Sequence, residues 1–294
     1  MSGGIVIVDK PADWTSQDVT AKLRGVFAQR RVGHGGTLDP MATGVLPVFV
    51  GRATRAVSFF EAADKEYLAS LRLGLVTNTQ DTTGEILAQN PADVSDGDLA
   101  AVLARFLGPQ EQLPPMYSAV KIGGKKLYEL ARKGQEVERT PRQITIHALE
   151  YLGRDPANGD VRLRVACSKG TYIRTLCADL GAALGCGGCM SALRRTRAGQ
   201  FTLDQAVTLD ELLAARAAGD VSGYLLPVDT LFAVYPALTL TARGETACRN
   251  GNPVPFAGAP EGLCRVYGPE GTFLILGRGE NGRLYTVKSF FEVT

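Results

Sequence analysis

Asp39 is the one acidic side chain in a run of glycine, small and apolar residues, "RVGHGGTLDPMATGVLP" (31–47). A solvated loop usually carries several charges, and a core strand usually carries none. An ionised carboxylate that is poorly hydrated needs a paired cation or hydrogen-bond donors. The chain must therefore supply a partner for Asp39 from elsewhere, and a carboxylate held in this way is suited to nucleophilic attack.

Two residues elsewhere in the chain are candidates to work with Asp39. Arg174 follows Tyr172 at the start of a largely apolar helical pattern, and Tyr67 starts an alternating strand pattern. An Asp kept ionised by an Arg, with aromatic faces nearby, suits a carboxylate nucleophile that acts on a flat base. Arg–Asp pairs and buried tyrosines are also common structural features. The residue types alone therefore leave both interpretations open.

The residues around Asp39 predict a tight, directed loop. Gly33, Gly35 and Gly36 would let the backbone approach a ligand without side-chain bulk. Pro40 restricts the backbone of the residue before it, so that the Asp39 carboxylate is held within a narrow range of directions.

The elements that must position these residues follow from hydrophobic periodicity. An apolar run and two alternating patterns predict strands over 4–11, 67–75 and 160–170. Patterns of helical period predict helices over 15–28, 95–108 and 171–185. Ser16 is a plausible N-cap for the first helix.

Residues 121–142 carry seven Lys or Arg against three Glu, a local charge of +4 in a chain whose net charge is +2. Charge runs of this kind are usually solvated surfaces. Tyr128 among the cations and Tyr117 before them favour an RNA contact instead, made by an exposed, mobile arm. The cations assigned to phosphate contacts are Lys121, Lys125, Lys126, Arg132 and Lys133. Residues 193–200 add a second basic patch.

The C-terminal part changes in character after a linker predicted over 224–238, where Pro227 and Pro236 mark the boundary. From about residue 237 the chain consists of short strands and glycine turns. "GRGENG" (277–282) fits the dinucleotide pattern GxGxxG, but a strand-like segment follows it and no helix is available to hold a pyrophosphate. Asn281-Gly282 predicts a β-hairpin turn instead.

Composition limits the function classes. At 294 residues the chain can form one large domain and a small one, and a charge of +2 indicates no overall basic field. The N-terminal apolar run is too short for a signal peptide, and no segment has the length of a membrane span. A cytoplasmic location is expected. Cys186 and Cys189 form a CxxC, but no second CxxC accompanies it, so no metal site is predicted.

Five motifs together resemble the TruB family, the bacterial tRNA pseudouridine-55 synthases. They are "GHGGTLDPMATGVLPV", "KEYLASLRLG", "DTTGE", "PPMYSAVKIGGKKLYELARKG" and "SKGTYIRTLCADLG". They occur in the family's order, and the similarity covers nearly the whole chain. The C-terminal module resembles a PUA domain more weakly.

The resemblance implies roles for individual residues. Asp39 would be the nucleophile, Tyr67 would stack on the target base and serve in proton removal, and Arg174 would pair with Asp39. The positions that match those lining the substrate pocket are His34, Tyr67, Tyr172, Leu193 and Lys10. Asp13 stands where a glycine is usual, which concerns the shape of the loop and not the chemistry.

The expected fold is α+β. A mixed, mainly antiparallel sheet with flanking helices would form a catalytic domain over 1–235, including a basic RNA-binding arm at about 111–142. A small β-rich, PUA-like RNA-binding domain would occupy 236–294.

The resemblance implies an isomerase that converts a uridine in the T arm of tRNA, at position 55, to pseudouridine after flipping the base out of its stack. Reactant and product have the same atoms, so no cofactor or metal is expected. The partner would be tRNA, without a guide RNA and without a membrane, and the protein would be a monomer. Two alternatives are a guide-RNA-dependent synthase and a non-catalytic tRNA-binding or tRNA-folding protein. The sequence leaves open whether Asp39 attacks the base or the sugar.

Overall fold

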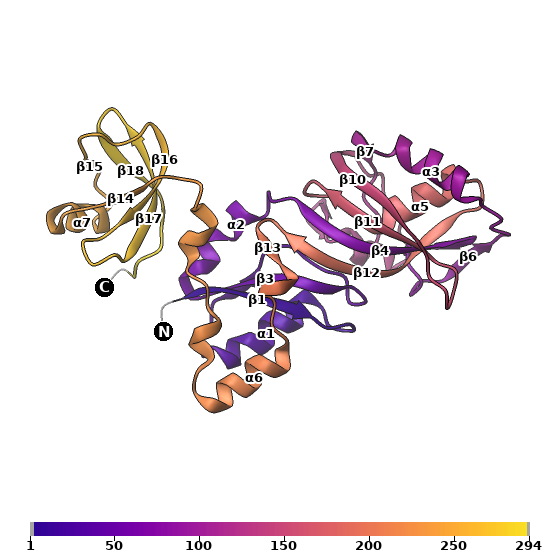
Figure 1. Cartoon of the computed structure of the whole chain (residues 1–294), viewed down its shortest axis with the longest axis horizontal. Helices are drawn as coiled ribbons and strands as arrows, with labels where there is room; N and C mark the ends of the chain where they lie inside the picture. Colours follow the sequence, from indigo (N-terminus) through magenta and orange to yellow (C-terminus); the bar gives the residue numbers. More distant parts are fainter. Residues whose placement is uncertain (1–2, 293–294) are drawn as a thin grey trace.

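A computed structural model describes residues 3–292 and has two parts, a large α+β part and a smaller β-rich module (Figure 1). The predicted fold class is confirmed: the larger part is a mixed, mainly antiparallel sheet with flanking helices. Its strands are β1 (Gly4–Lys10), β2 (Val32–His34), β3 (Thr43–Val50), β4 (Lys65–Leu73), β7 (Gly108–Gln112), β10 (Arg142–Arg154), β11 (Val161–Cys167), β12 (Gly188–Ala198) and β13 (Phe201–Thr202).

The order of the main sheet explains how distant segments meet. The strands lie in the order β1-β3-β12-β4-β11-β10-β7, with β2 paired to β3 and β13 to β12. All neighbours are antiparallel except β3 and β12, which are parallel. Strand β12 therefore joins the segment after the Asp39 loop to the strand that carries Tyr67.

Strand β1 reads as an almost unbroken apolar run because both of its faces are buried. Val6 and Val8 belong to the core under the helices, whereas Ile5 and Ile7 belong to a second core on the other face. A strand with only one buried face would alternate instead.

The N-cap of helix α1 (Ser16–Val26) lies one residue earlier than the sequence suggested. It is Thr15, whose hydroxyl accepts from the Asp18 backbone N–H while the Asp18 carboxylate accepts from the Thr15 backbone N–H, a capping box. The predicted N-cap, Ser16, is instead the first helical residue. Its hydroxyl accepts from the backbone N–H of Leu38 at 2.8 Å, which ties the helix to the residue before Asp39.

The remaining predicted helices are present as α3 (Asp96–Arg105) and α5 (Ile173–Ala183), and both bury their apolar stripe in the larger core. Helix α6 (Leu209–Ala218) packs on the same core. The strand predicted over 67–75 is interrupted: Gly74 has a φ of +79°, so β4 ends at Leu73. The chain then forms a separate hairpin from β5 (Leu75–Thr77) and β6 (Ile86–Gln89).

Residues 224–238 do not form a free linker. Ile5 and Leu226 exchange two backbone hydrogen bonds of 2.8 Å, so this segment extends the edge of the main sheet beside β1. The 3₁₀ helix η4 (Val228–Phe232) follows. The expectation of a linker was wrong because its apolar residues are used to cover the sheet edge and the second core.

The C-terminal module is a five-stranded sheet in the order β14-β16-β17-β18-β15. Its elements are β14 (Ala237–Thr239), α7 (Ala242–Arg249), β15 (Val254–Pro255), β16 (Gly262–Tyr267), β17 (Phe273–Glu280) and β18 (Arg283–Ser289). Asn281 and Gly282 have φ of +49° and +71° between β17 and β18, so the predicted hairpin is confirmed and no helix follows the GxGxxG pattern.

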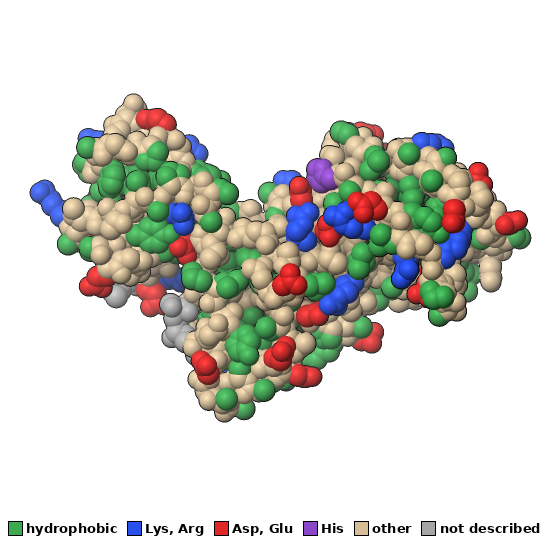
Figure 2. All heavy atoms as spheres, in the orientation of Figure 1, with side chains coloured by type: hydrophobic (Ala, Val, Ile, Leu, Met, Phe, Trp, Pro, Cys, Tyr) green, Lys and Arg blue, Asp and Glu red, His purple; other side chains and the backbone are tan. Residues whose placement is uncertain are grey.

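The two parts meet through aromatic side chains. The ring of Phe232 lies 6.2 Å from that of Phe273 and 5.9 Å from that of Phe290. The hydroxyl of Tyr267 donates to Asp229 Oδ2 at 2.6 Å. Figure 2 shows the indentation that remains between the module and the larger part.

Among the described residues, no helix has both the length and the apolar character that a bilayer crossing requires.

Candidate active site

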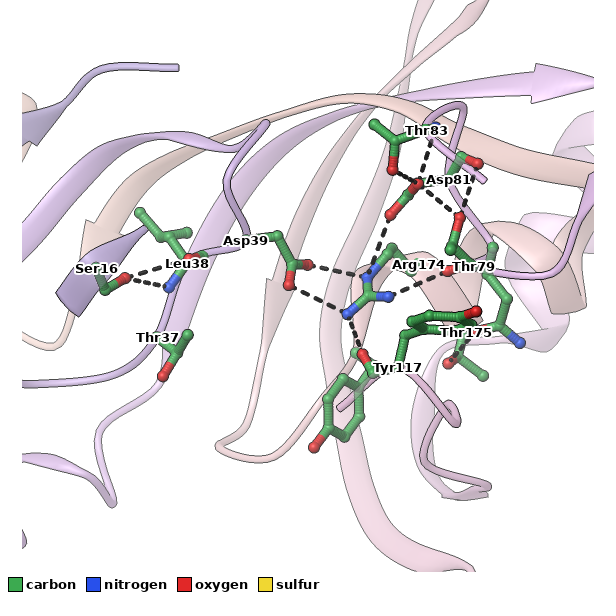
Figure 3. Close-up of polar contacts among 12 residues, drawn as sticks. Ser16, Thr37, Leu38, Asp39, Thr79, Asp81, Thr83, Tyr117, Arg174 and Thr175 are labelled. Atoms are coloured by element: carbon green, nitrogen blue, oxygen red, sulfur yellow. Dashed lines mark hydrogen bonds and ion pairs between the residues drawn. The ribbon is translucent and has the colours of Figure 1, made fainter. Parts of the chain in front are cut away.

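The carboxylate of Asp39 and the guanidinium of Arg174 point toward each other from opposite sides of the site (Figure 3). Arg174 Nε donates to Asp39 Oδ2 at 2.9 Å and Nη2 donates to Oδ1 at 3.1 Å. The Arg174 side chain is 6% exposed and that of Asp39 is 35% exposed. The cation is therefore buried behind a carboxylate that remains open to an approaching ligand, and the paired hydrogen bonds fix the direction of that carboxylate.

The first turn of α5 holds Arg174 in place. Tyr172 is the N-cap residue, and its backbone N–H and carbonyl exchange hydrogen bonds of 2.8 and 3.0 Å with the side-chain amide of Gln112. Arg174 also donates to the carbonyls of Thr79 (3.1 Å) and Tyr117 (2.8 Å). The guanidinium thus connects Asp39 to two segments that are remote in sequence.

A second carboxylate, Asp81, was not identified from the sequence as a site residue. Its Oδ2 lies 3.8 Å from Arg174 Nε, and the residue is 5% exposed. Oδ1 accepts from the Thr79 hydroxyl (2.7 Å), the Thr83 hydroxyl (2.6 Å) and the Thr83 backbone N–H (3.0 Å). The turn "TQDTTG" that contains it was the available signal, since Asp and Thr side chains commonly fold back on turn backbones.

Lys10 supports the loop and is not open to a substrate. The residue has no exposed surface, and its ammonium donates to the carbonyls of Pro11 (2.7 Å), Trp14 and Pro40 (3.1 Å). Burial lowers the pKa of Lys10 to about 8, although the negative charges of Asp13 and Asp39 oppose this shift. The prediction that Lys10 lines the substrate pocket is corrected, because its buried ammonium binds the Pro40 carbonyl and so fixes the backbone next to Asp39.

Gly35 and Gly36 have different reasons to be glycine. A Cβ on Gly35 would lie 2.4 Å from the ring of Phe60, so this glycine permits packing against the second core and not approach to a ligand. Gly36 has a φ of +110°, a conformation that favours glycine. The expectation of a glycine-lined ligand surface is therefore wrong for Gly35.

Tyr67 lies on β4, next to Arg195 of β12 in the sheet register. The residue is 8% exposed and belongs to the larger core. Burial raises the pKa of the Tyr67 hydroxyl, and the positive charge of Arg195 opposes that rise. The negative charge of Asp39 contributes a smaller rise in the same pKa.

His34, Leu193 and Tyr172, the other predicted pocket residues, differ in burial and in their partners. His34 ends β2, and its Nδ1 is buried with no hydrogen-bond partner in the described part of the chain. Burial, helped by the charge of Arg195, lowers the pKa of His34. Leu193 is 8% exposed and packs in the same core as Tyr67. Tyr172 is half-buried beside Arg174.

The basic arm is folded. Strands β8 (Lys121–Ile122) and β9 (Lys125–Lys126) form a hairpin, and helix α4 (Leu127–Ala131) buries Leu127 and Leu130. The expectation of a wholly exposed arm is therefore corrected. Four of the five predicted phosphate-binding cations are exposed: Lys121, Lys125, Arg132 and Lys133. Lys126 is half-buried, with its ammonium 5.4 Å from the centre of the Tyr128 ring.

Residues 193–200 form a smaller basic surface than predicted, because Arg195 is buried while the Arg194 side chain is 39% exposed. Arg194 donates to both carboxylate oxygens of Asp9, at 3.0 and 2.7 Å. Arg195 is 1% exposed, and Arg197 donates to the carbonyl of Gly199 at 3.1 Å. Cation spacing in the sequence did not reveal that these side chains have partners inside the protein.

The CxxC pair is buried. Cys186 and Cys189 are free thiols with 6% and 0% exposure, and burial raises the pKa of Cys189 to about 11. In residues 3–292 no group of three or more His, Cys, Asp or Glu side chains is placed to hold a metal ion.

Two hollows in the surface are lined by residues other than Asp39. One, of about 760 Å³, lies at the junction with the C-terminal module and is lined by residues such as Arg52, Asp229 and Phe290. Another, of about 320 Å³, is lined by Phe59, Leu231 and Tyr235. Neither contains a predicted site residue. The chemistry of the site is therefore read from its side chains. Asp39 is an open carboxylate with a fixed direction, Arg174 is the buried cation that holds it, and Tyr67 is a buried phenol. This set suits nucleophilic attack on a base presented from outside.

Comparisons with known proteins show which family models the chain matches. Residues 24–173 match the model for the TruB family pseudouridylate synthase N-terminal domain. Residues 174–233 match the model for the tRNA pseudouridylate synthase B C-terminal domain. The two models together extend from α1 to η4.

Curated relatives agree with this match. The chain is 47% identical over 270 residues to tRNA pseudouridine synthase B of Ralstonia pickettii, covering 90% of this chain and 84% of that protein. It is 45% identical over 287 residues to tRNA pseudouridine synthase B of Pseudomonas fluorescens, covering 96% and 93%.

Solved structures resemble the whole chain. A Cbf5-Nop10-Gar1 complex contains a chain with a TM-score of 0.73 and 28% identity, covering 98% of this chain and 85% of that one. An H/ACA RNP bound to a substrate RNA containing 2'-deoxyuridine gives the same TM-score at 26% identity and the same coverage.

Proposed function

The chain belongs to the TruB family of pseudouridylate synthases, and we propose that it acts on tRNA by means of Asp39. It is a tRNA pseudouridine synthase, an isomerase. The substrate position that the family resemblance implies is uridine 55 in the T arm. Because that substrate is a cytoplasmic RNA, we also propose that the protein works in the cytoplasm.

The observation that carries the proposal is the paired hydrogen bonding of Arg174 to a half-open Asp39. A carboxylate held in a fixed direction needs little reorganisation before it attacks. The target base is flipped out of its stack to reach it. Asp39 then forms a covalent bond, at the base or at the anomeric carbon of the sugar, while the glycosidic bond breaks.

The later steps fall to Tyr67. The freed uracil rotates, a bond forms between its C5 and the anomeric carbon, and the C5 proton leaves. Tyr67 stacks on the base and takes part in removing this proton. Tyr172, His34 and Leu193 shape the pocket around it. Lys10 supports the Asp39 loop from inside the protein, where its ammonium donates to the Pro40 carbonyl.

RNA binding outside the site is assigned to two surfaces. The exposed cations of the arm contact phosphates, and the module over 236–294 acts as a PUA-like RNA-binding domain attached to the catalytic domain over 1–235. We propose a monomer that needs no guide RNA. The chain is 45–47% identical to proteins named tRNA pseudouridine synthase B and 28% identical to the chain in the Cbf5 complex. The higher identity supports this proposal over the guide-dependent alternative.

One experiment separates the candidate functions. Purified protein is incubated with an unmodified tRNA transcript, and pseudouridine is mapped by chemical adduct formation and primer extension. Pseudouridine at position 55 with protein alone is the expected result. Modification only after a cell RNA fraction is added would indicate a guide-dependent enzyme, and binding without modification would indicate a non-catalytic protein.

A further inference from the structure

Arg195 occupies a central place in the sheet that the proposed mechanism does not use. In the register of β12 it lies opposite Tyr67 of β4 on one side and opposite Gly44 of β3 on the other. Its own carbonyl is so close to Gly44 that a Cβ there would lie 2.2 Å away. One residue therefore links the strand that follows the Asp39 loop with the strand that carries Tyr67.

The side chain of Arg195 fastens both ends of the Asp39 loop. Its Nε donates to the carbonyl of Val45 at 2.7 Å, and its Nη2 donates to the carbonyl of Gly36 at 3.1 Å. Gly36 precedes Asp39 by three residues and Val45 follows it by six. The planar guanidinium suits this task because its donors point in fixed directions.

The charge of Arg195 has no carboxylate partner. None of the described carboxylates lies within 4.0 Å of it, whereas the neighbouring Arg194 is 2.7 Å from Asp9. Arg195 is nevertheless 1% exposed. Burying an ion in this way costs several kcal/mol compared with exposure to water, and an apolar side chain of similar volume would often serve stability as well. The uncancelled positive charge instead lies beside Tyr67, the cross-strand neighbour of Arg195 in the register of β12 and β4.

The proton balance of the reaction gives this charge a use. Pseudouridine formation breaks the N1–C1′ bond and forms the C5–C1′ bond, so one proton leaves C5 and one is added at N1. If the Tyr67 oxygen gives its proton to N1 and takes up the proton from C5, the enzyme returns to its starting state without an external acid or base. Between the two transfers the tyrosine oxygen is negatively charged.

We propose that Arg195 is a positioning residue for this reaction: its guanidinium clamps the loop that carries Asp39 and stabilises negative charge on the Tyr67 oxygen during proton transfer. The inference rests on the proposed function, because it assigns Arg195 a part in the same isomerisation. It acts through the loop and Tyr67 and does not touch the substrate.

The test compares Arg195→Met and Arg195→Lys with the matched control Arg194→Met, which changes the adjacent, ion-paired arginine. Single-turnover rates are measured on an unmodified tRNA transcript between pH 6 and 9, with normal uridine and with uridine deuterated at C5. For Arg195→Met we expect a roughly hundredfold lower rate at pH 7 and a larger isotope effect, because proton transfer through Tyr67 becomes slower. The affinity for tRNA should stay within about threefold of wild type. Arg195→Lys keeps the charge and loses the fork, so it should keep the wild-type pH profile at a rate about tenfold lower.

Several results would overturn the inference. Rates for Arg195→Met and Arg194→Met within a factor of about two of each other would do so. A lower rate with an unchanged isotope effect would do so as well, because it indicates damage to structure alone. If Arg195→Met does not fold, the folded Arg195→Lys variant decides, since a wild-type rate from it rules out the clamp. Inactivity of the wild-type protein on tRNA would instead contradict the proposed function, whatever the Arg195 variants do.

Discussion

Asp81 Oδ2 lies 3.8 Å from Arg174 Nε, the same nitrogen that donates to Asp39 Oδ2 at 2.9 Å, and Asp81 has almost no contact with solvent. The guanidinium thus faces an open carboxylate and a buried one at the same time. The buried carboxylate keeps Arg174 in position when a substrate engages Asp39, because an unpaired buried guanidinium would be costly.

Replacing Asp81 should therefore affect both stability and catalysis. In Asp81→Asn the Arg174 side chain loses a charged neighbour, and the hydrogen bonds from Thr79 and Thr83 lose their charge assistance. We expect the free energy of unfolding to fall by about 1–3 kcal/mol and turnover at saturating tRNA to fall by at least about tenfold. Urea denaturation and steady-state kinetics measure the two effects.

The matched control for this prediction is Asp160→Asn. Asp160 is equally buried and accepts two hydrogen bonds of 2.9 Å from Arg72, remote from the Asp39 loop. It should lose a similar free energy of unfolding while keeping its turnover. If both variants lose stability but neither loses turnover, Asp81 has no part in supporting Arg174 during the reaction.

Asp39→Asn should abolish turnover and leave tRNA affinity nearly unchanged. The amide keeps the shape of the carboxylate and one acceptor for Arg174 but is not a nucleophile. Asp13→Asn, an exposed change nearby in the structure, serves as the control. Residual activity within about tenfold of wild type corresponds to only ~1.4 kcal/mol of barrier and would remove Asp39 from its role.

Arg174→Lys should be damaging as well. A lysine ammonium cannot reproduce two parallel hydrogen bonds to Asp39 together with those to the carbonyls of Thr79 and Tyr117. We expect turnover to fall by about a hundredfold or more, measured beside Arg164→Lys as a surface control. Full activity in Arg174→Lys would mean that charge alone suffices and that the fixed geometry is unimportant.

The arm predicts a salt effect. If its exposed cations contact phosphates, binding releases counterions and weakens as salt rises. Lys125→Ala with Lys126→Ala should flatten the slope of log affinity against log salt by roughly 1 to 2 units. Half-buried Lys126, which packs on Tyr128, should contribute less than Lys125.

The control for the arm is the charge-matched double change Lys22→Ala with Arg24→Ala on α1. Affinities of all three proteins are measured at several salt concentrations. Turnover at saturating tRNA should stay close to wild type in the arm variant. A slope equal to that of wild type would identify the arm as an ordinary solvated surface.

The lowered pKa of Lys10 predicts how the free energy of unfolding depends on pH. Its pKa is lowered from 10.5 to about 8 in the folded protein, so between these values the unfolded chain binds more protons. Stability from this residue therefore rises with pH across that range, by at most ~1.4 kcal/mol per pH unit. The difference in the free energy of unfolding between wild type and Lys10→Met should be flat below pH 7 and should grow in favour of wild type above pH 8. Urea denaturation from pH 6 to 10.5 tests this, and parallel curves would contradict it.

Much of the fold was predictable because hydrophobic periodicity and turn residues depend only on neighbouring positions in the sequence. The strand β1 and the Asn281-Gly282 turn were predicted directly from neighbouring residues. The partners of the arginines were not readable in this way. Whether Arg194 and Arg195 are exposed depends on their position between β3 and β4, which is set by pairings between residues 126 to 151 positions apart in the sequence.

The site was predictable only in part, for a related reason. The lone carboxylate of Asp39 indicated that a cationic partner was needed, and the sequence analysis named Arg174 as a candidate for that partner. The burial of Lys10 and the position of Asp81 arise from loops folding over each other, which no spacing in the sequence reports.

The parallel pairing of β3 with β12 also bears on how the protein is made. Thr43 and Gly44 find their partners at Arg194 and Arg195, so the Asp39 loop is not fixed until a segment about 150 residues further along the chain has been synthesised. Long-range pairings of this kind form late and slowly. A chain still emerging from the ribosome would hold a disordered nucleophile, and the catalytic centre would form only as the catalytic domain closes.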